Sequence, residues 1–427
     1  MLRKSLPSGL TRWVDISFSD KDMRKPTRRR ANFCVIVREE ATMKFKLMML
    51  AAALMVSATA AAQTRGVTKT EITFGMHTDL SGVAATYGVS SANAVKMRFD
   101  EVNETGGIFG RKINIIIEDH AYQVPKAVQA CNKLINRDNV FAFIAALGTS
   151  MNNACFKDQL AAGVPNLFPL SAARSMFEPY DRLKFYGAAT YVDQIRSAVS
   201  YFVKEKGKKA ICVMYQDTDF GKEIVVGAEA QAQKLGIKVT AISAHKPTDQ
   251  DFTASLTNLK AAGCDLVLMG TIVRDTIIPY TAARKMGWTD VDFVGSAAVY
   301  DGVVGAAQGM DGLYAMGLTE MPYADSPVES VRKFFAAYKA KYNVDPNIGA
   351  VYGYVAADLT VTGLKNAGAD LTLDSFVNGL ESIKNYQDIF NGPQLNFGLN
   401  IRQGANSSFL AVVKGGRWTR VTQTLSF

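Results

Sequence analysis

Short apolar runs alternate with helical apolar stripes along the first part of the chain. Five β-rich runs lie at residues 72–75, 113–118, 140–147, 166–168 and 184–186. Each is too short and too uniformly apolar for a strand with one solvated face, so these runs predict central parallel strands. Between two of them, apolar residues recur at helical spacing at Val124, Ala127, Val128, Cys131, Leu134 and Ile135. That stripe predicts a helix whose apolar face covers the sheet.

The same alternation starts again near residue 191. Helices are predicted at 191–206, 222–235 and 276–286 and around Phe252, Leu256 and Leu259, with strands at 210–215, 237–244, 266–270 and 293–295. Strands that alternate with helices of this length indicate right-handed βαβ units. Two such series predict an α/β fold with two doubly wound, Rossmann-like lobes.

The pattern changes after a short apolar run at 312–316. Three helices are predicted next, at 328–342, 350–366 and 373–382, and the tail from residue 394 is β-like. Gly415-Gly416 predicts a hairpin turn between strands at 409–414 and 418–421. No low-complexity linker separates the two series, which suits a hinged pair of lobes that share several crossovers.

An export signal is predicted near the N-terminus. Met43-Lys44-Phe45-Lys46 precedes an apolar run at 47–62, and Ala60-Ala61-Ala62 offers small residues for cleavage before Gln63. Residues 43–62 are interpreted as a signal peptide without a cysteine for lipid anchoring, so the product is expected in the periplasm. Residues 1–42 have no place in such a signal and are interpreted as a non-native extension from a wrongly chosen start codon. The alternative is a twin-arginine signal, but Arg29-Arg30 lies far upstream of the apolar run.

Composition and charge exclude several classes of protein. The 427 residues are 48% hydrophobic and 20% charged, which is typical of a globular chain. The net charge of +9 is concentrated in residues 1–62, which carry +7 and leave +2 for the rest. Because the folded part is nearly neutral, we expect no nucleic-acid partner.

Cysteines and histidines give little support for a metal site. Apart from Cys34, the cysteines are Cys131, Cys155, Cys212 and Cys264, none with CxxC spacing, and the three histidines are far apart. We expect no metal and no cofactor. Cys131 and Cys155 fall in predicted helices that flank one strand, so they can pair or stay reduced. Cys212 and Cys264 lie in apolar strand contexts and are interpreted as buried free thiols.

The sequence lacks the common enzyme motifs. It contains no GxSxG, GxxxxGK[ST] or HExxH pattern. His77 and His120 lie in loop contexts but without a nucleophile elbow, so we expect no catalytic residues. Asp217-Thr218-Asp219 resembles a metal-binding DxD, but an aspartate cap on a helix that begins near Gly221 is the favoured interpretation.

Two strand-to-helix junctions carry small hydroxyl residues. Gly148-Thr149-Ser150 follows the run at 140–147, and Ser171-Ala172-Ala173 follows the run at 166–168. Ligands of open parallel sheets bind beyond the carboxyl ends of the strands, where helix N-termini present unpaired N–H groups. Both loops can hold a carboxylate, although capping by Thr149 or Ser150 explains the first loop equally well.

A series of motifs resembles, in order, the branched-chain amino-acid type of periplasmic binding protein. They are Leu80-Ser81-Gly82, Tyr87-Gly88, Glu101-Val102-Asn103, Gly106-Gly107-Ile108, Glu118-Asp119, Gly148-Thr149-Ser150, Asp217 to Gly221, Asp251-Phe252-Thr253, and Tyr352 with Tyr354. The resemblance covers residues 67 to about 420. It implies a type I periplasmic binding protein, in which two lobes joined by a three-crossover hinge close on a small solute and deliver it to an ABC permease in the inner membrane.

The resemblance also implies domain limits and a site. Residues 66–190 with 318–393 would form the first lobe, and 191–317 with 394–427 the second. The family's carboxylate-binding loops fall on Thr149-Ser150 and Ser171 to Ala173, and its aromatic contacts fall on Tyr87 and Phe220. The full set of implied substrate-binding residues is Tyr87, Thr149, Ser150, Ser171, Ala172, Ala173, Tyr191, Phe220, Thr271 and Ala297.

One departure from the family concerns the ligand. The acids that pair with a ligand ammonium in amino-acid-binding members fall on Tyr191 and Ala297 here. A buried ammonium without an anionic partner costs several kcal/mol. We therefore expect at least one aromatic or branched carboxylate without an α-amino group to stabilise the protein more than leucine, isoleucine or valine, unless Asp79, Asp275 or Asp301 replaces the missing acids. An amino acid stays as the alternative ligand. We expect a monomeric transport protein; a binding protein that serves a sensor or receptor, and a secreted α/β enzyme, are the alternative functions.

Overall fold

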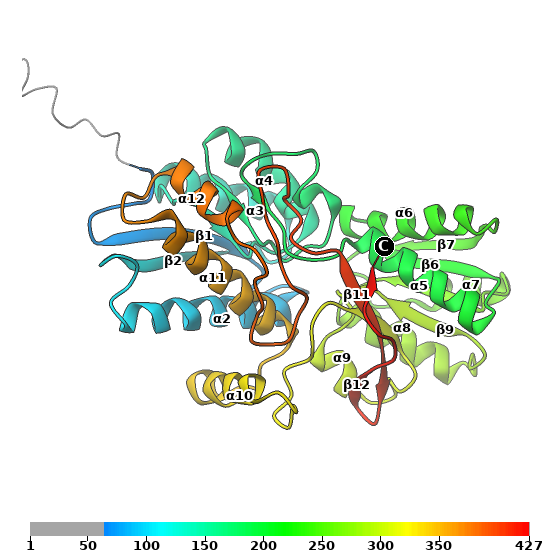
Figure 1. Cartoon of the computed structure of the whole chain (residues 1–427). Helices are drawn as coiled ribbons and strands as arrows, with labels where there is room; N and C mark the ends of the chain where they lie inside the picture. Colours follow the sequence, from blue (N-terminus) through cyan, green and yellow to red (C-terminus); the bar gives the residue numbers. More distant parts are fainter. Residues whose placement is uncertain (1–63, 427) are drawn as a thin grey trace, which may run out of the picture. The chain divides into compact units, whose positions relative to one another are not determined.

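The computed structural model describes residues 64–426 (Figure 1). The predicted extension, 1–42, and the predicted signal peptide, 43–62, lie outside the described residues. Within 64–426, none of the helices has both the length and the apolar character that a membrane crossing requires.

The first sheet contains five parallel strands in the order β2-β1-β3-β4-β5. They are β1 (Glu71–Thr78), β2 (Lys112–Asp119), β3 (Phe143–Ile144), β4 (Asn166–Leu167) and β5 (Lys184–Phe185). All five predicted strands are confirmed, although the apolar run at 140–147 pairs over two residues only. This order is doubly wound and places the switch point between β1 and β3.

The second sheet repeats that winding and then adds antiparallel strands. Its order is β12-β11-β10-β9-β8-β6-β7, with β13 beside β11, and β6 to β10 are parallel. The strands are β6 (Ile211–Gln216), β7 (Val239–His245), β8 (Leu266–Gly270), β9 (Asp292–Gly295), β10 (Tyr314–Gly317), β11 (Ser407–Lys414), β12 (Arg417–Arg420) and β13 (Leu425–Ser426). The predicted tail hairpin is confirmed, with φ of 58° at Gly415 and 75° at Gly416, as a type I′ turn requires.

The helices divide between the two sheets. With the first sheet lie α2 (Ala85–Glu104), α3 (Val124–Asn132) with its π-helical end (Lys133–Arg137), α4 (Thr149–Ala161), a 3₁₀ turn (Arg174–Met176), α10 (Glu329–Tyr342), α11 (Ile348–Ala367) and α12 (Leu373–Glu381). With the second lie α5 (Tyr191–Lys206), α6 (Asp219–Lys234), α7 (Thr253–Ala261), α8 (Arg274–Lys285) and α9 (Gly302–Ala306). Figure 1 shows α11 beside α2. Gly353 permits this close approach, because a Cβ there would lie 2.4 Å from the carbonyl oxygen of Ser91.

The chain passes between the two lobes three times. The first passage joins β5 to α5, the second joins β10 to α10, and the third leads into β11. The third passage lies later in the chain than residue 394, where the chain was predicted to return to the second lobe. Phe397 packs against Phe168 and Phe185 in the first lobe, and Gln403 pairs with Tyr186. The buried aromatic contacts therefore hold the segment 394–403 on the first sheet before the chain returns.

Hydroxyl side chains cap several helices. Thr190 caps α5 by accepting from the N–H of Asp193, and Thr372 forms a capping box with Ser375 on α12. The predicted aspartate cap of α6 is wrong, because the Thr218 hydroxyl accepts from the N–H of Gly221 at 3.3 Å and Asp219 lies in the first turn.

Two disulfides link neighbouring elements. Cys131 at α3 joins Cys155 on α4, and Cys212 joins Cys264 with a Cα–Cα distance of 5.8 Å. The interpretation of Cys212 and Cys264 as free thiols is wrong. β6 pairs with β8 so that Ile211 faces Leu266, and this pairing brings Cys264, two residues before β8, next to Cys212. The sequence predicted both strands but not that they are neighbours.

Candidate functional site

The carboxyl ends of both sheets open onto one cavity. Segments after β1, β3 and β4 and after β6, β8 and β9 line it, through Tyr87, Thr149, Ser171, Phe220, Ile272 and Ala297. Both switch points therefore face the same space, which is where doubly wound sheets bind ligands. The cavity has a volume of about 160 Å³ open to water molecules.

Two hydroxyls meet where α4 begins. The Oγ1 atom of Thr149 lies 2.8 Å from the Oγ atom of Ser171, and both side chains are almost fully buried. The N-cap of α4 is Gly148, without a side-chain cap. The alternative that Thr149 or Ser150 only caps this helix is therefore wrong. The first N–H groups of α4 lack intrahelical partners, so hydroxyls and a helix N-terminus converge on one wall of the cavity.

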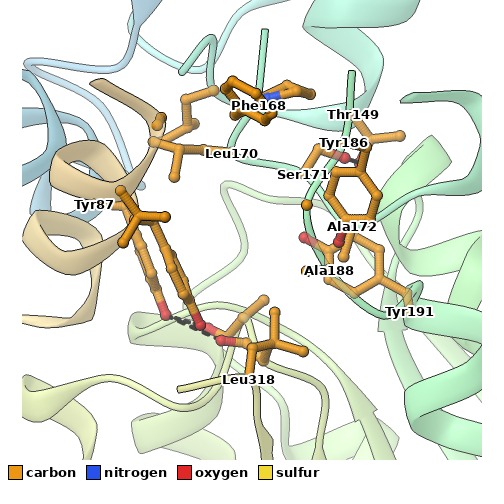
Figure 2. Close-up of a pocket in the computed structure, with 18 of the residues that line it drawn as sticks. Tyr87, Thr149, Phe168, Leu170, Ser171, Ala172, Tyr186, Ala188, Tyr191 and Leu318 are labelled. Carbon is orange, nitrogen blue, oxygen red and sulfur yellow. Dashed lines mark hydrogen bonds between the residues drawn. The ribbon is translucent and has the colours of Figure 1, made fainter. Parts of the chain in front are cut away.

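Aromatic rings supply much of the remaining lining. The rings of Tyr191 and Phe220 pack edge to face with centroids 4.8 Å apart, although they come from different helices. Burial raises the pKa of Tyr191 to about 12, so its hydroxyl stays neutral. Figure 2 shows Tyr87 on the side of the cavity opposite Thr149, Ser171, Tyr186 and Tyr191. A flat apolar ligand body can therefore lie between aromatic faces.

Tyr87 connects the two lobes. It lies on α2, and its hydroxyl donates to the carbonyl oxygen of Ala298 at 3.0 Å, with that of Ala297 at 3.5 Å (Figure 2). Ala297 is held by a second contact, because its N–H donates to the Oε1 atom of Gln194 at 2.7 Å. The loop after β9 is thereby tied both to α5 and to the opposite lobe.

Two aromatic residues of the lining have a strained backbone. Tyr122 and Phe168 have φ of 55° and 49°, in the left-handed region that costs a non-glycine residue about 1–2 kcal/mol. Both follow strands of the first sheet. Strain of this kind gathers at functional sites, where packing over-determines the backbone.

The aspartates named from the sequence have other partners. Asp79 accepts from the backbone N–H groups of Ser81, Gly82 and Ala84 at the entry to α2. Asp275 accepts from Gln216 and from the N–H of Ile272 and contacts His245 at 2.9 Å. None of the three, Asp301 included, lines the cavity in the described part of the chain.

Asp301 lies outside the cavity lining, whereas Asp388 is part of it. Asp301 caps α9 by accepting from the N–H of Val303 at 2.8 Å, and burial raises its pKa to about 6. Among the described residues, Asp388 is the acidic residue that lines the cavity. One of its oxygens, Oδ1, accepts from the N–H groups of Phe390 and Gly392, and burial raises the pKa of this carboxyl as well.

Comparison with known proteins decides the family. The model of the periplasmic binding protein family matches residues 71–417. This chain belongs to the periplasmic binding protein family. Its relatives place it in the branched-chain amino-acid type: a Leu/Ile/Val-binding protein homolog 8 of Brucella suis biovar 1 is 24% identical over 390 residues, which cover 88% of this chain and 94% of the relative.

Solved structures agree on the two-lobed type I fold of this periplasmic binding protein. A fatty acid ABC transporter substrate-binding protein from Thermomonospora curvata has a TM-score of 0.77 at 26% identity, covering 86% of this chain and 95% of the other. A solute-binding protein from R. palustris, in complex with benzoate, has a TM-score of 0.73 at 18% identity, covering 84% and 98%. The relatives are solute-binding proteins and not enzymes.

Most of the site residues expected from the sequence line the cavity of this binding protein. They are Tyr87, Thr149, Ser171, Ala172, Tyr191, Phe220 and Ala297. Three lie outside the lining. Ser150 accepts from the N–H of Asp219 at 3.3 Å, Ala173 is buried behind Ser171, and Thr271 is fully buried with its Oγ1 atom 2.6 Å from that of Thr276.

Sequence reasoning missed one side of the binding protein's cavity. The lining also contains Tyr122, Phe168, Leu170, Tyr186, Leu318, Tyr352, Val355, Ala356, Leu359, Pro393 and Leu395. Tyr352 was part of a matched motif, but its hydroxyl is buried and lacks a hydrogen-bond partner among the described residues. The signal was available in α11, where Tyr352, Val355, Ala356 and Leu359 recur at helical spacing. Such a stripe predicts a buried face without saying what faces it.

Two histidines and a disulfide form a buried cluster behind the cavity lining, where His120 contacts the backbone of Leu147 and Tyr122. His77 lies near Cys131 and Cys155, but the two sulfur atoms are bonded to each other and offer no thiolate to a metal. His77 lies in β1 and His120 directly follows β2, and both side chains are fully buried. Burial lowers the pKa of His77 to about 3, with His120 adding to the shift, which keeps the imidazole neutral.

Proposed function

We propose that this chain is the solute-binding component of an ABC importer and that its ligand is a carboxylic acid with an apolar body and no α-amino group. The observation that carries the proposal is the asymmetry of the cavity. Hydroxyls and a helix N-terminus gather on one wall, at Thr149 and Ser171, while aromatic and aliphatic side chains make up most of the rest.

The hydroxyl wall suits a carboxylate. Of the bonded Thr149 and Ser171 hydroxyls, one donates to the other, which leaves one O–H free to donate to a carboxylate oxygen. The N-terminus of α4 adds backbone N–H donors and a partial positive charge. Hydrogen bonds to an ionised acceptor are about twice as strong as neutral ones. A neutral Tyr191 hydroxyl next to Ser171 can add a further donor.

An α-amino group has no matching anion at this wall. Asp79 and Asp275 are engaged by other groups, and Asp301 lies outside the lining. Asp388 does line the cavity, but its Oδ1 atom already accepts from the N–H groups of Phe390 and Gly392 within its own segment. An ammonium held in this space would therefore lose water without gaining a charge partner, at a cost of several kcal/mol.

The comparisons support an apolar acid. The T. curvata protein, 26% identical, is a fatty acid ABC transporter substrate-binding protein, and the R. palustris protein is in complex with benzoate. Both ligands are carboxylates without an amino group. An amino acid is the competing ligand, since the relatives include Leu/Ile/Val-binding protein homologues.

Lobe closure would connect ligand binding to transport. Besides Tyr87 with Ala298, the lobes meet where Asn153 donates to Asp219 at 2.9 Å and where Arg174 pairs with Glu223 at 3.2 Å. A ligand that touches both lobes would stabilise a closed form only by its differential affinity for that form. A permease in the inner membrane would then recognise the closed form, after export of the chain to the periplasm and cleavage near Gln63. N-terminal sequencing of periplasmic material tests the export step. A periplasmic product that retains residues 1–42 would contradict it.

A panel of matched ligands tests the ligand class. The melting temperature of the mature protein is measured with leucine and 4-methylpentanoate, and with phenylalanine and 3-phenylpropanoate, since each acid differs from its amino acid by the amino group alone. Benzoate completes the panel, and 4-methylpentanamide controls for the carboxylate. We expect the two acids to raise the melting temperature more than their amino acids, and the amide to have no effect. Stabilisation by the amino acids alone would refute the proposal and make Asp388 the candidate ammonium partner.

A further inference from the structure

The cavity continues beyond the hydroxyl wall along α11. Tyr352, Val355, Ala356 and Leu359 line it at spacings of three, four and seven residues, so they form one stripe on the helix surface. At a rise of 1.5 Å per residue, the stripe from Tyr352 to Leu359 extends about 10 Å. That length exceeds what the side chain of a branched-chain amino acid needs.

The other walls of this compartment come from three separate segments. Phe168 and Leu170 follow β4, Leu318 follows β10, and Pro393 and Leu395 lie in the segment before the third crossover. A Cβ on Gly187, also in the lining, would lie 3.5 Å from Leu395 and 4.0 Å from Phe168. Gly187, Leu395 and Phe168 therefore lie close together. Because Gly187 has no side chain, the space beside it stays open.

The segment with Pro393 and Leu395 is held by its own hydrogen bonds. Tyr386 and Leu395 exchange backbone hydrogen bonds of 3.0 and 2.9 Å. Between them, Asp388 accepts from the N–H groups of Phe390 and Gly392. Asp388 thus has local hydrogen-bond partners that hold this segment together.

The aliphatic side chains of the compartment are deeply buried, and Tyr352 adds one buried hydroxyl without a partner among the described residues. Ala356, Leu359 and Leu395 are 2%, 1% and 4% exposed. The Thr319 hydroxyl, which also lines it, donates to the carbonyl oxygen of Phe390 at 3.4 Å. Space of this kind gives water few hydrogen-bond partners, so an apolar group fills it at lower cost.

We propose that this compartment, between the α11 stripe and the segment 393–395, is a tail seat that takes the unbranched hydrocarbon tail of a medium-chain carboxylic acid. The inference rests on the proposed function, because the carboxylate of that acid would occupy the Thr149–Ser171 wall. Leu170 and Ser171 are consecutive in the chain, so the loop after β4 runs directly from the tail seat to the carboxylate wall.

A chain-length series tests the tail seat. Isothermal titration calorimetry of the mature protein is carried out with butanoate, hexanoate, octanoate and decanoate, with 4-methylpentanoate as a branched reference. Each methylene that enters the seat should tighten binding about fourfold, so octanoate should bind on the order of 100-fold more tightly than butanoate. An affinity that is flat or falls beyond butanoate would overturn the tail seat while leaving the carboxylate proposal standing. Binding of none of the acids would overturn both.

Substitutions on α11 locate the tail. Ala356→Leu fills the seat and should weaken octanoate binding at least tenfold while butanoate changes less than twofold. Val355→Phe, at a half-buried position of the same stripe, provides a second block should Ala356→Leu fail to fold. Lys365→Ala, at an exposed position of α11 outside the lining, is the control and should change neither affinity. Equal losses for octanoate and butanoate in both blocking variants would contradict the placement.

Discussion

The hydroxyl of Tyr87 donates across the cleft to the carbonyl oxygen of Ala298 at 3.0 Å, so a side chain of the first lobe holds the backbone of the second. The same ring lines the cavity beside the ligand space. One residue therefore serves both as wall and as link between the lobes. Its substitution should affect binding through closure as well as through contact.

Removing this link should weaken binding without unfolding the protein. A neutral hydrogen bond contributes about 0.5–1.5 kcal/mol, so Tyr87→Phe should lower affinity for the best acid of the panel threefold to tenfold. Tyr87→Ala, which also removes the ring, should lower it by more than tenfold. Calorimetry gives the affinities, and the melting temperature of each unliganded variant should stay within a few degrees of the parent. Tyr180→Phe, which removes an exposed hydroxyl bonded to Leu399, is the control; normal binding by Tyr87→Ala would argue against this wall.

The hydroxyl wall makes a separate prediction. Thr149→Val keeps the shape of the side chain and removes its hydroxyl, and Ser171→Leu fills the space beside it. Both should weaken carboxylate binding more than tenfold, about 1.4 kcal/mol, with little change in the melting temperature of the unliganded protein. Thr362→Val offers a matched control, since Thr362 bonds the Asp358 carbonyl on α11 away from the cavity. If Thr149→Val bound the acid as tightly as this control, the carboxylate would have to lie elsewhere.

The Cys212–Cys264 disulfide should contribute measurably to stability. It closes a loop with a sequence separation of 52, for which the chain-entropy model gives about 4 kcal/mol. Replacing both cysteines with alanine should lower the urea midpoint of unfolding. A reductant should lower the midpoint of the parent by breaking this disulfide, an effect that the variant cannot show because it lacks the disulfide. Free-thiol titration of the unfolded, non-reduced parent provides the direct check. Two reactive thiols that map to Cys212 and Cys264 would show that the pair is reduced.

Asp301 should make stability fall as pH rises. Burial raises its folded pKa from 3.8 to about 6, so between these values the folded state binds the proton that the unfolded state has lost. Stability from this group is complete below pH 3.8 and is lost as pH rises to 6, by about 3 kcal/mol at about 1.36 kcal/mol per pKa unit.

Asp301→Asn removes that charge and isolates its effect. The amide oxygen can still accept from the N–H of Val303, so the helix cap is kept. The variant should melt at a higher temperature than the parent at pH 8, and the difference should shrink toward pH 4. Thermal melts across this range test the sign of the effect; a variant less stable than the parent at pH 8 would refute it.

The local sequence pattern was enough to predict most helices and strands and part of the site. The apolar runs predicted every strand of the first sheet, and the helix predicted at 191–206 coincides with α5. The helical residues 85–104 of α2 were not predicted, since their small and polar residues give a weak apolar stripe. Thr149 and Ser171 were found because ligands of parallel sheets bind where strands end, and the ends of β3 and β4 could be read from the sequence.

By itself, the sequence determined two series of parallel strands, the loops that carry hydroxyls, and the absence of an acid at Tyr191 and Ala297. Tertiary structure alone decided which elements are neighbours: Cys212 with Cys264, Tyr87 with Ala298, and α11 with the segment at 393–395. The reason is physical. Strand and helix periodicity reflect interactions between residues a few positions apart, whereas a cavity forms where segments more than 200 residues apart in the chain pack against one another. A stripe such as Tyr352 to Leu359 records that one face is buried, and only the packed fold shows that part of this face borders open space.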